Sequence, residues 1–314
     1  METPLRLDHA AKITDENKAR ELLESLRWPN GVACPRCGSM DVYKIEAGQG
    51  SKMRPGVYRC KDCRKLGKNN QFTVTVGTIF EDSHIRLSLW LMAISLMCAS
   101  KKGISAHQMH RMMGITYKSA WFMCHRIRYA MAMPSKKKLR GIIEVDETYI
   151  GGRKKGSGKV GAAGVAEKAP VVALVQRNGE VRSYAVPVVS AQSLREVVFA
   201  NVHKSAHLMT DELKAYKKIG KNFASHESVQ HSKLEYVRGN VSTNTVEGFF
   251  GLLKRGVNGT FHHISREHLH RYLSEFDFRY NRRKITDQQR TVQAIAGFEG
   301  KRLMYRDSLV RKHG

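Results

Sequence analysis

Four of the six cysteines form two closely spaced pairs, Cys34-Pro-Arg-Cys37 and Cys60-Lys-Asp-Cys63, separated by a glycine-containing segment. Apolar β-formers flank both pairs, as they do where two short strands are joined by a turn. Two Cys-x-x-Cys turns beside such a hairpin can present four thiolates to one Zn²⁺ ion in tetrahedral geometry. The spacing therefore predicts a zinc ribbon over residues 30–80, with all four cysteines bound to a structural zinc.

Two disulfides, a redox pair or four unrelated thiols are the alternative uses of these cysteines. The chain starts without an apolar signal segment, and its longest apolar run, Leu89–Ala99, is too short to span a bilayer. We therefore expect a cytoplasmic protein without membrane contacts, in which disulfides are rare and metal binding is favoured. Cys98 and Cys124 stand singly in apolar helical patterns and are predicted to be core residues.

The net charge is +26, from 54 Lys and Arg against 28 Asp and Glu. The excess is spread along the chain, since residues 34–69, 70–140, 141–255 and 256–314 are each basic overall. Such a charge favours a nucleic-acid partner, with an acidic membrane surface as the alternative. Residues 141–255 differ from the others because they contain 11 of the 28 acidic residues.

Residues 84–133 predict a helical module. A short helix over Ser105–Met113, a turn at Gly114 and a longer helix from Thr116 to Met131 resemble a helix-turn-helix. Its predicted DNA-binding residues are Lys118, Arg126 and Arg128. The alternative is a packing module with a solvated basic face. An N-terminal helical segment (1–29) precedes the ribbon, and a basic linker (134–140) follows the helices.

Acidic residues recur at element ends between residues 141 and 260. An apolar strand ends at Asp146, a hairpin turns at Asn178-Gly179, and a helix over 193–202 carries a Ser193/Glu196 capping box. A short strand then ends at Asp211, and Glu247 lies on an amphipathic helix over 243–255. This order predicts a ribonuclease-H-like α/β domain that brings the three acids to one sheet edge.

Three converging carboxylates could bind two Mg²⁺ or Mn²⁺ ions. Two such ions together catalyse displacement reactions at a phosphodiester. Alternatives remain for each acid. Asp146 and Asp211 could be ordinary turn residues, and their neighbours Glu147 and Glu212 could be the ligands instead. Glu247 could serve only as the capping partner of Asn244.

The motifs VDETYIGG (145–152), TDELKAY (210–216), HSKLEYVRG (231–239) and NTVEGFFGLLKR (244–255), behind a zinc ribbon, resemble DDE-type bacterial insertion-sequence transposases. The resemblance implies that Asp146, Asp211 and Glu247 bind catalytic Mg²⁺, with Asn244 as the alternative third residue. It also implies a basic residue seven positions after the glutamate, here Lys254.

The resemblance implies a transposase that binds the inverted-repeat ends of its element, hydrolyses them and joins the 3′-OH ends to target DNA. Lys154 and Lys155, in the basic loop after the first strand, are further expected DNA contacts. Synapsis of two ends implies a homodimer or higher assembly. The last segment (261–314) is predicted to be basic and helical, and its residues 262–283 are expected to pack on the core, with DNA contact as the alternative. The alternatives are a non-catalytic DNA-binding regulator and a nuclease without strand transfer.

Overall fold

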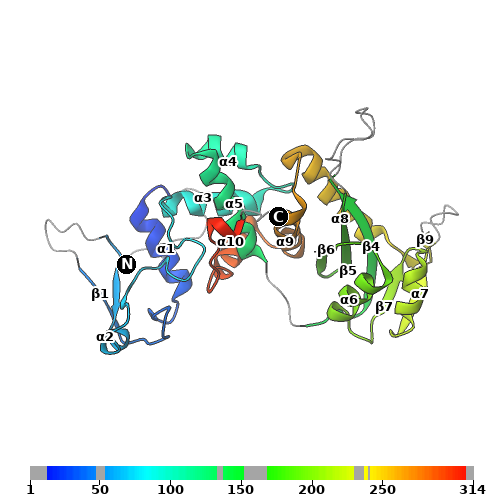
Figure 1. The fold of residues 1–314 in the computed structure, drawn as a ribbon, viewed down its shortest axis with the longest axis horizontal. Coiled ribbons are helices and arrows are strands. Elements are labelled where there is room, and N and C mark those ends of the chain that lie inside the picture. The colour runs from blue at the N-terminus through cyan, green and yellow to red at the C-terminus, as the bar shows by residue number, and fades with distance from the viewer. Residues whose placement is uncertain are drawn as a thin grey trace, which may run out of the picture. The chain divides into compact units, whose positions relative to one another are not determined.

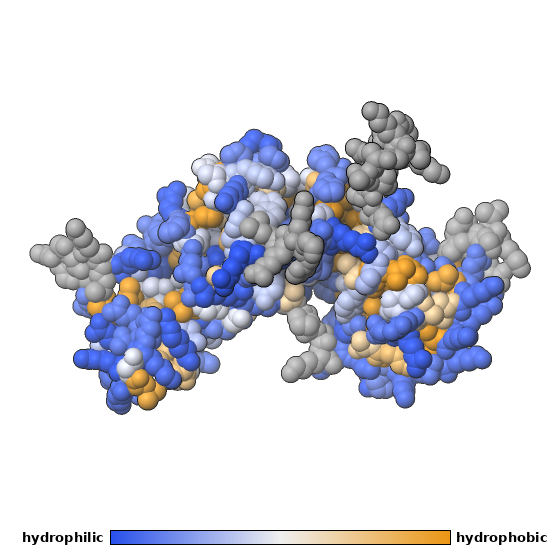
Figure 2. Space-filling view, in the orientation of Figure 1, coloured by the Kyte–Doolittle hydropathy of each residue, from blue (hydrophilic) through white to orange (hydrophobic). Residues whose placement is uncertain are grey.

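The computed structural model describes residues 13–46, 54–132, 137–151, 168–229, 237–239 and 241–308. The chain divides into two compact units, which are visible in the ribbon drawing (Figure 1). The first contains residues 1–100, 106–131 and 285–314, and the second contains residues 101–105 and 132–284. Hydrophilic residues cover most of the visible face of each unit, as the high net charge leads one to expect (Figure 2). Among the described residues, no helix combines the length and the apolar character needed to cross a membrane.

The first unit begins with a helix and a small three-stranded antiparallel sheet of order β1-β2-β3. Its elements are α1 (Glu16–Arg27), β1 (Val42–Lys44), β2 (Tyr58–Cys60), α2 (Lys61–Lys65) and β3 (Gln71–Phe72). The run of β-formers that starts at Phe72 does not continue the strand, because a Val76 N–H to Thr73 carbonyl bond of 3.2 Å turns the chain. The four cysteines and this small sheet form the predicted N-terminal zinc-ribbon domain.

Aromatic side chains join α1 to the ribbon sheet. The ring of Trp28 lies edge-on to that of Tyr58, with centroids 5.6 Å apart, and the Tyr58 ring stacks on Phe72 at 5.8 Å. The Tyr58 hydroxyl donates a 2.9 Å hydrogen bond to Glu24 of α1. The helix is thus part of the small core that a domain of this size needs around its metal site.

The rest of the first unit is helical. It contains α3 (Leu87–Ala99), α4 (Ala106–Met113), α5 (Tyr117–Met131), α10 (Asp287–Ala296) and α11 (Tyr305–Ser308). The turn between α4 and α5 is made by Gly114 in the left-handed region, at φ +65°, and the Thr116 hydroxyl accepts from Ser119 N–H to cap α5. Cys98 and Cys124 are fully buried, which confirms their prediction as core residues.

The second unit is built on a mixed five-stranded sheet of order β6-β5-β4-β7-β8. Its strands are β4 (Ile142–Ile150), β5 (Ala169–Gln176), β6 (Val181–Ala185), β7 (His207–Thr210) and β8 (Ser225–Ser228). β4, β5 and β6 pair antiparallel, whereas β7 is parallel to both β4 and β8. The predicted hairpin turn is present, with Asn178 at φ +59°.

Helices cover both faces of this sheet. They are α6 (Ala191–Asn201), α7 (Lys214–Gly220), α8 (Asn244–Gly256) and α9 (Leu269–Asn281). In addition, β9 (Val237–Arg238) and β10 (Val241–Ser242) form a small two-stranded antiparallel sheet. One core cluster contains residues of α8 and α9 packed on Ile150 and Ala173. The other contains residues of α6 and α7 packed on Ile143 and Val145. Alternate positions of β4 therefore face different helices.

Two predicted element bounds change. β4 continues through Asp146 to Ile150, and only its parallel pairing with β7 stops at Val145, so the carboxylate marks the end of that pairing rather than of the strand. The helix predicted to begin at Ser193 begins at Ala191, because Ser190 caps it and exchanges hydrogen bonds with Ser193. Glu196 is therefore not the capping partner.

The segment after residue 260 does not form one module. Leu269, Leu273 and Phe276 of α9 are buried in the core of the sheet unit, at the helical spacing that predicted packing. The chain from Ile285 onward belongs instead to the first unit, where α10 contributes the buried Ala294 and Ile295. A helix packs where its apolar face finds a complementary surface, which the linear sequence does not specify.

Candidate active site and zinc centre

The four predicted zinc ligands lie together. Their sulfur atoms are all within 4.8 Å of one another, and all six cysteines of the chain are free thiols. Across the two pairs, the Sγ atoms of Cys34 and Cys63 are 3.8 Å apart and those of Cys37 and Cys60 are 3.5 Å apart. Four sulfurs at Zn–S distances of about 2.3 Å in a tetrahedron lie about 3.8 Å from one another. The cluster thus fits one Zn²⁺ ion.

The surroundings of these sulfurs shift their pKa values in opposite directions. The backbone N–H of Cys63 donates to the Sγ of Cys60 at 3.4 Å, and this bond is the main cause that lowers the pKa of Cys60. The hydrogen bond from Cys37, followed by burial, raises the pKa of Cys63 to about 12. Sulfurs this crowded need a cation among them before all four can be deprotonated.

The sheet register places Asp146 and Asp211 side by side. Val145 of β4 pairs with Thr210 of β7, and Asp146 and Asp211 are the residues that directly follow this pair in the chain. Because neighbouring strands are about 4.8 Å apart, the two residues are adjacent where the parallel pairing ends. Asp211 is held in a turn in which its Oδ1 accepts from Leu213 N–H at 3.1 Å. The register therefore places these two acids at the same edge of the sheet.

Glu247 comes from the helix that covers the same face. Asp146 lies opposite Ala173, whose side chain packs in the α8 and α9 core, and Glu247 is in the first turn of α8. Its Oε1 accepts a 2.8 Å hydrogen bond from the Thr243 hydroxyl. Asn244 is the first residue of α8, with Thr243 as the N-cap, so Glu247 does not complete a capping box with Asn244. Asn244 is itself exposed.

The electrostatics connect all three acids. Burial is the main cause that raises the pKa of Asp146 to about 7, and the charges of Glu147, Asp211 and Glu247 contribute to the same rise. Among the residues that the structure describes, only the cysteines form a group of possible metal ligands within 4.8 Å, so the three carboxylates are spaced more widely than that. A carboxylate destabilised by burial and by like charges is typical of a site that takes up a cation.

Glu147 and Glu212, the alternative ligands, lie differently. Glu147 pairs with Val172 on the α6 and α7 face of the sheet, and its Oε2 accepts a 2.7 Å hydrogen bond from the hydroxyl of Tyr216. Burial is the main cause that raises its pKa. This contact joins the strand of Asp146 to the helix that follows Asp211. Glu212 is exposed.

Glu144 is a buried site residue that the sequence interpretation missed. It lies two positions before Asp146 on β4, it is fully buried, and its carboxylate accepts hydrogen bonds from Arg177 and from the first turn of α8. The available signal was a carboxylate inside an otherwise apolar strand, Ile142-Ile143-Glu144-Val145. Without the fold, that position could not be distinguished from a solvent-facing one.

The predicted DNA-binding residues fall into three groups. Lys118 and Lys254 are exposed, although the Lys118 ammonium also lies 4.6 Å from the centre of the Tyr305 ring. Lys154 and Lys155 lie outside the described residues. The other two predicted contacts, Arg126 and Arg128, are buried.

Arg126 and Arg128 are only 5% and 1% exposed, which is at odds with direct DNA contact. Arg126 Nε donates to the Leu303 carbonyl at 3.0 Å and its Nη2 to the Glu81 carbonyl at 2.9 Å, and burial lowers its pKa. In α5 the first turn is exposed at Tyr117 and Lys118, whereas residues 123–128 are all buried. The Arg126 guanidinium therefore connects elements inside the unit, and the Arg128 side chain is enclosed in the same unit.

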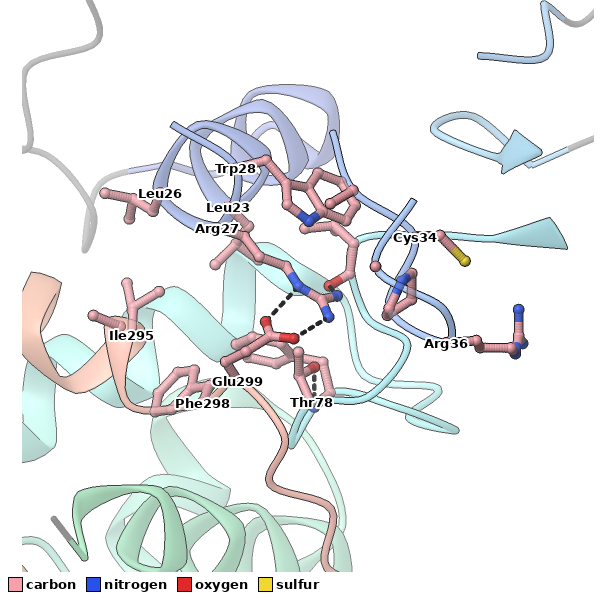
Figure 3. Close-up of a pocket in the computed structure, with 16 residues that line it drawn as sticks. Leu23, Leu26, Arg27, Trp28, Cys34, Arg36, Thr78, Ile295, Phe298 and Glu299 are labelled. Atoms are coloured by element: carbon pink, nitrogen blue, oxygen red, sulfur yellow. Dashed lines mark hydrogen bonds and ion pairs between the residues drawn. The ribbon is translucent and has the colours of Figure 1, made fainter. Parts of the chain in front are cut away.

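The first unit also contains a half-open cavity of about 490 Å³, lined by α1, the ribbon and α10 (Figure 3). Its walls are mostly apolar, with Leu23, Trp28 and Phe298 among them. Arg27 crosses it and forms a two-point ion pair with Glu299, at 2.7 and 2.8 Å. All of its lining residues belong to the first unit, so it is not part of the acidic site.

Comparisons with known proteins agree with this architecture. Residues 14–66 match the family model described as transposase zinc-ribbon domain, and residues 138–281 match that described as ISXO2-like transposase domain. A protein of Halobacterium salinarum, described as an uncharacterized protein in transposable element ISH50, is 29% identical over 282 residues. The match covers 85% of this chain and 91% of that protein. The resemblance to insertion-sequence transposases with a zinc ribbon is thereby confirmed.

Proposed function

We propose that this chain, which matches two transposase domain models, is a DNA transposase that cuts the ends of an insertion sequence and joins them to target DNA. The observation that supports this most directly is the placement of Asp146, Asp211 and Glu247 around one edge of the mixed sheet. These residues come from two strands and a helix and are separated by up to 101 positions, so only the fold brings them together.

The sheet topology supports a ribonuclease-H-like fold for the second unit. Three antiparallel strands, a helix, a parallel strand and a later helix with an acid follow one another in the chain. The two acids next to each other on β4 and β7 lie beside the sheet position where parallel pairing ends. Sites in mixed and parallel sheets form at such strand ends because loops diverge there.

Asp146, Asp211 and Glu247 are the residues that would hold Mg²⁺ or Mn²⁺. The donor set fits a hard cation, since it consists of carboxylate oxygens, and a cation would compensate the like charges that contribute to the raised pKa of Asp146. When bound, two such ions would supply the charge that activates an attacking oxygen and stabilises a leaving oxygen. The chain's own contribution is to keep the three carboxylates converging from separate elements.

We assign DNA binding to exposed basic residues of both units. We propose that the ribbon and the α4–α5 pair, arranged as a helix-turn-helix, contact the element ends through exposed groups that include Lys118. Lys254 lies two turns after Glu247 on α8 and would contact the DNA backbone near the cut. Lys154 and Lys155 remain predicted contacts. A dimer or higher assembly would hold two ends together.

Cleavage assays on full-length protein with DNA that carries the element ends would test the acidic site. Asp146→Asn and Glu247→Gln are expected to lower the cleavage rate in Mg²⁺ by at least about 10³-fold, the scale seen when a group acting in the transition state is lost. Glu147→Gln is the matched control, because its carboxylate faces the other side of the sheet, and it should retain most activity. Equal activity of Asp146→Asn and wild type would refute the assignment.

The same assay separates the alternatives. If Asn244→Ala abolishes cleavage while Glu247→Gln does not, the third ligand is Asn244. Wild type that binds DNA without nicking it would favour a regulator, and cleavage without target-joined products would favour a nuclease. Short inverted repeats flanking the gene would independently support transposition.

A further inference from the structure

The fully buried carboxylate of Glu144 is satisfied by four donors from two other elements. Its Oε2 accepts from the backbone N–H groups of Thr245 and Val246 at 2.7 and 3.0 Å. Its Oε1 accepts from the Thr245 hydroxyl at 2.9 Å and from Arg177 Nε at 2.7 Å. A carboxylate with this many close donors is fixed in orientation and is well suited to hold the elements that supply them.

These contacts cap α8 from outside the helix. The N-cap residue, Thr243, makes no side-chain capping bond to the backbone, since its hydroxyl is directed to Glu247. The first N–H groups of a helix have no partner within it and carry the positive end of the helix dipole. Glu144 supplies the missing acceptor from β4, so the strand and the helix are joined at one carboxylate.

Arg177 completes the arrangement. Its Nη2 donates to the carbonyl and the hydroxyl of Ser242, at 3.0 and 2.8 Å, while its Nε binds Glu144. The guanidinium therefore connects the end of β5 to the residue before the N-cap of α8. It also compensates the buried charge, because a carboxylate in such a site is stable only when it is paired and fully hydrogen-bonded.

We propose that Glu144 is a positioning residue that fixes the first turn of α8, and with it Glu247, relative to Asp146 on the same strand. The inference rests on the proposed function. Glu144 and Asp146 are two positions apart on β4 and face the same side of the sheet, while Thr245 and Val246 immediately precede Glu247. One rigid contact thus sets the separation between two carboxylates that would share metal ions.

Glu144→Gln in the full-length, zinc-containing protein tests this role. The amide keeps one acceptor oxygen but turns an NH₂ group toward donors, so the first turn of α8 loses its fixed position. We expect the Mn²⁺ concentration for half-saturation, measured by electron paramagnetic resonance without DNA, to rise roughly 10–100-fold. The Mg²⁺ concentration for half-maximal cleavage should rise similarly, with DNA affinity unchanged.

Glu275→Gln is the matched control. Glu275 is also fully buried and forms an ion pair with Arg279, but it lies on α9, away from the first turn of α8. Both variants lose a buried charge and some stability. If the role of Glu144 were purely structural, the metal concentrations for half-saturation and half-maximal cleavage would be unchanged in both variants. If Glu144→Gln does not fold, the double variant Glu144→Gln/Arg177→Met replaces it, because it leaves no guanidinium without its carboxylate. This variant should show the same rise in the metal concentration for half-saturation.

The outcomes are distinct. Wild-type metal midpoints in folded Glu144→Gln, or an equal rise in Glu275→Gln, would overturn the positioning role while leaving an active wild type as a transposase. If wild type itself showed no Asp146-dependent Mn²⁺ binding and no cleavage, the proposed function would fail and the positioning role with it. A rise in the metal concentration for half-saturation that is confined to the Glu144 variants would establish the positioning role.

Discussion

The zinc centre and the acidic site both gather groups of like charge, but they do so in different ways. The zinc centre uses two pairs from nearby segments, and its four sulfurs all lie within 4.8 Å. The acidic site takes Asp146, Asp211 and Glu247 from two strands and a helix, and these carboxylates are not as close. A structural metal site is closed by its ligands, whereas the catalytic site that we propose would have to leave room for substrate.

Two acids on β4 also differ from each other in how their carboxylates are hydrogen-bonded. Glu144 is fully buried yet completely hydrogen-bonded, while Asp146, two residues later, accepts from Glu147 N–H and faces other carboxylates that raise its pKa. The first carboxylate holds the structure together, and the second is destabilised in the absence of a cation. Two acidic residues on one strand can therefore differ in role, one serving stability and the other the proposed chemistry.

Removing a zinc ligand should have the largest effect. We expect Cys60→Ser to lose bound zinc and to unfold the ribbon, because structural zinc contributes about 10–16 kcal/mol in small domains. Zinc stoichiometry and the near-ultraviolet circular dichroism of the ribbon would measure the loss. Cys98→Ala should retain the metal, since Cys98 is a core residue of α3. A full complement of zinc in Cys60→Ser would contradict the four-cysteine site.

Asp146→Asn should stabilise the metal-free protein at high pH. The pKa of Asp146 is about 7 in the folded protein, above its ordinary value. The free energy of unfolding therefore falls as the pH rises from that ordinary value to about 7. The asparagine removes this loss, so at pH 8 the variant should gain up to about 4 kcal/mol, and the gain should vanish toward pH 4. Urea unfolding at both pH values measures it, and an equal effect at pH 4 and pH 8 would contradict the electrostatic cause.

Arg126→Met should affect stability and not DNA binding. The substitution leaves the Leu303 and Glu81 carbonyls without their donor, at a cost of about 1–3 kcal/mol. Chemical unfolding and fluorescence anisotropy with labelled DNA would separate the two properties. Weaker DNA binding at unchanged stability would restore the original prediction that this residue contacts DNA.

Lys254→Ala should give the smallest change. Losing one exposed phosphate contact should weaken DNA binding modestly at all sequences and reduce the slope of affinity against salt by about 1. Lys204→Ala is the control, because Lys204 is exposed before β7, at the opposite end of that strand from Asp211. Identical salt slopes for the two variants would remove Lys254 from the DNA contacts.

Much of the architecture could be predicted locally. The Cys-x-x-Cys spacing, the α4–α5 turn at Gly114 and the Asn178-Gly179 hairpin each depend on neighbouring residues, and all three are confirmed. The buried arginines were misjudged because a basic residue at helical spacing is exposed or enclosed according to what packs around the helix. α10 and the residues after it return to the first unit and supply part of that enclosure.

The sequence by itself determined the four cysteines that cluster, much of the order of the strands and helices, and a short set of acidic candidates whose types suit a divalent cation. Only the tertiary structure decided that Asp146 rather than Glu147 faces α8, because one step along a strand reverses the side chain. It also decided that Glu144 caps that helix. Alternation within a strand is local, but which face meets which helix depends on packing between residues more than a hundred positions apart.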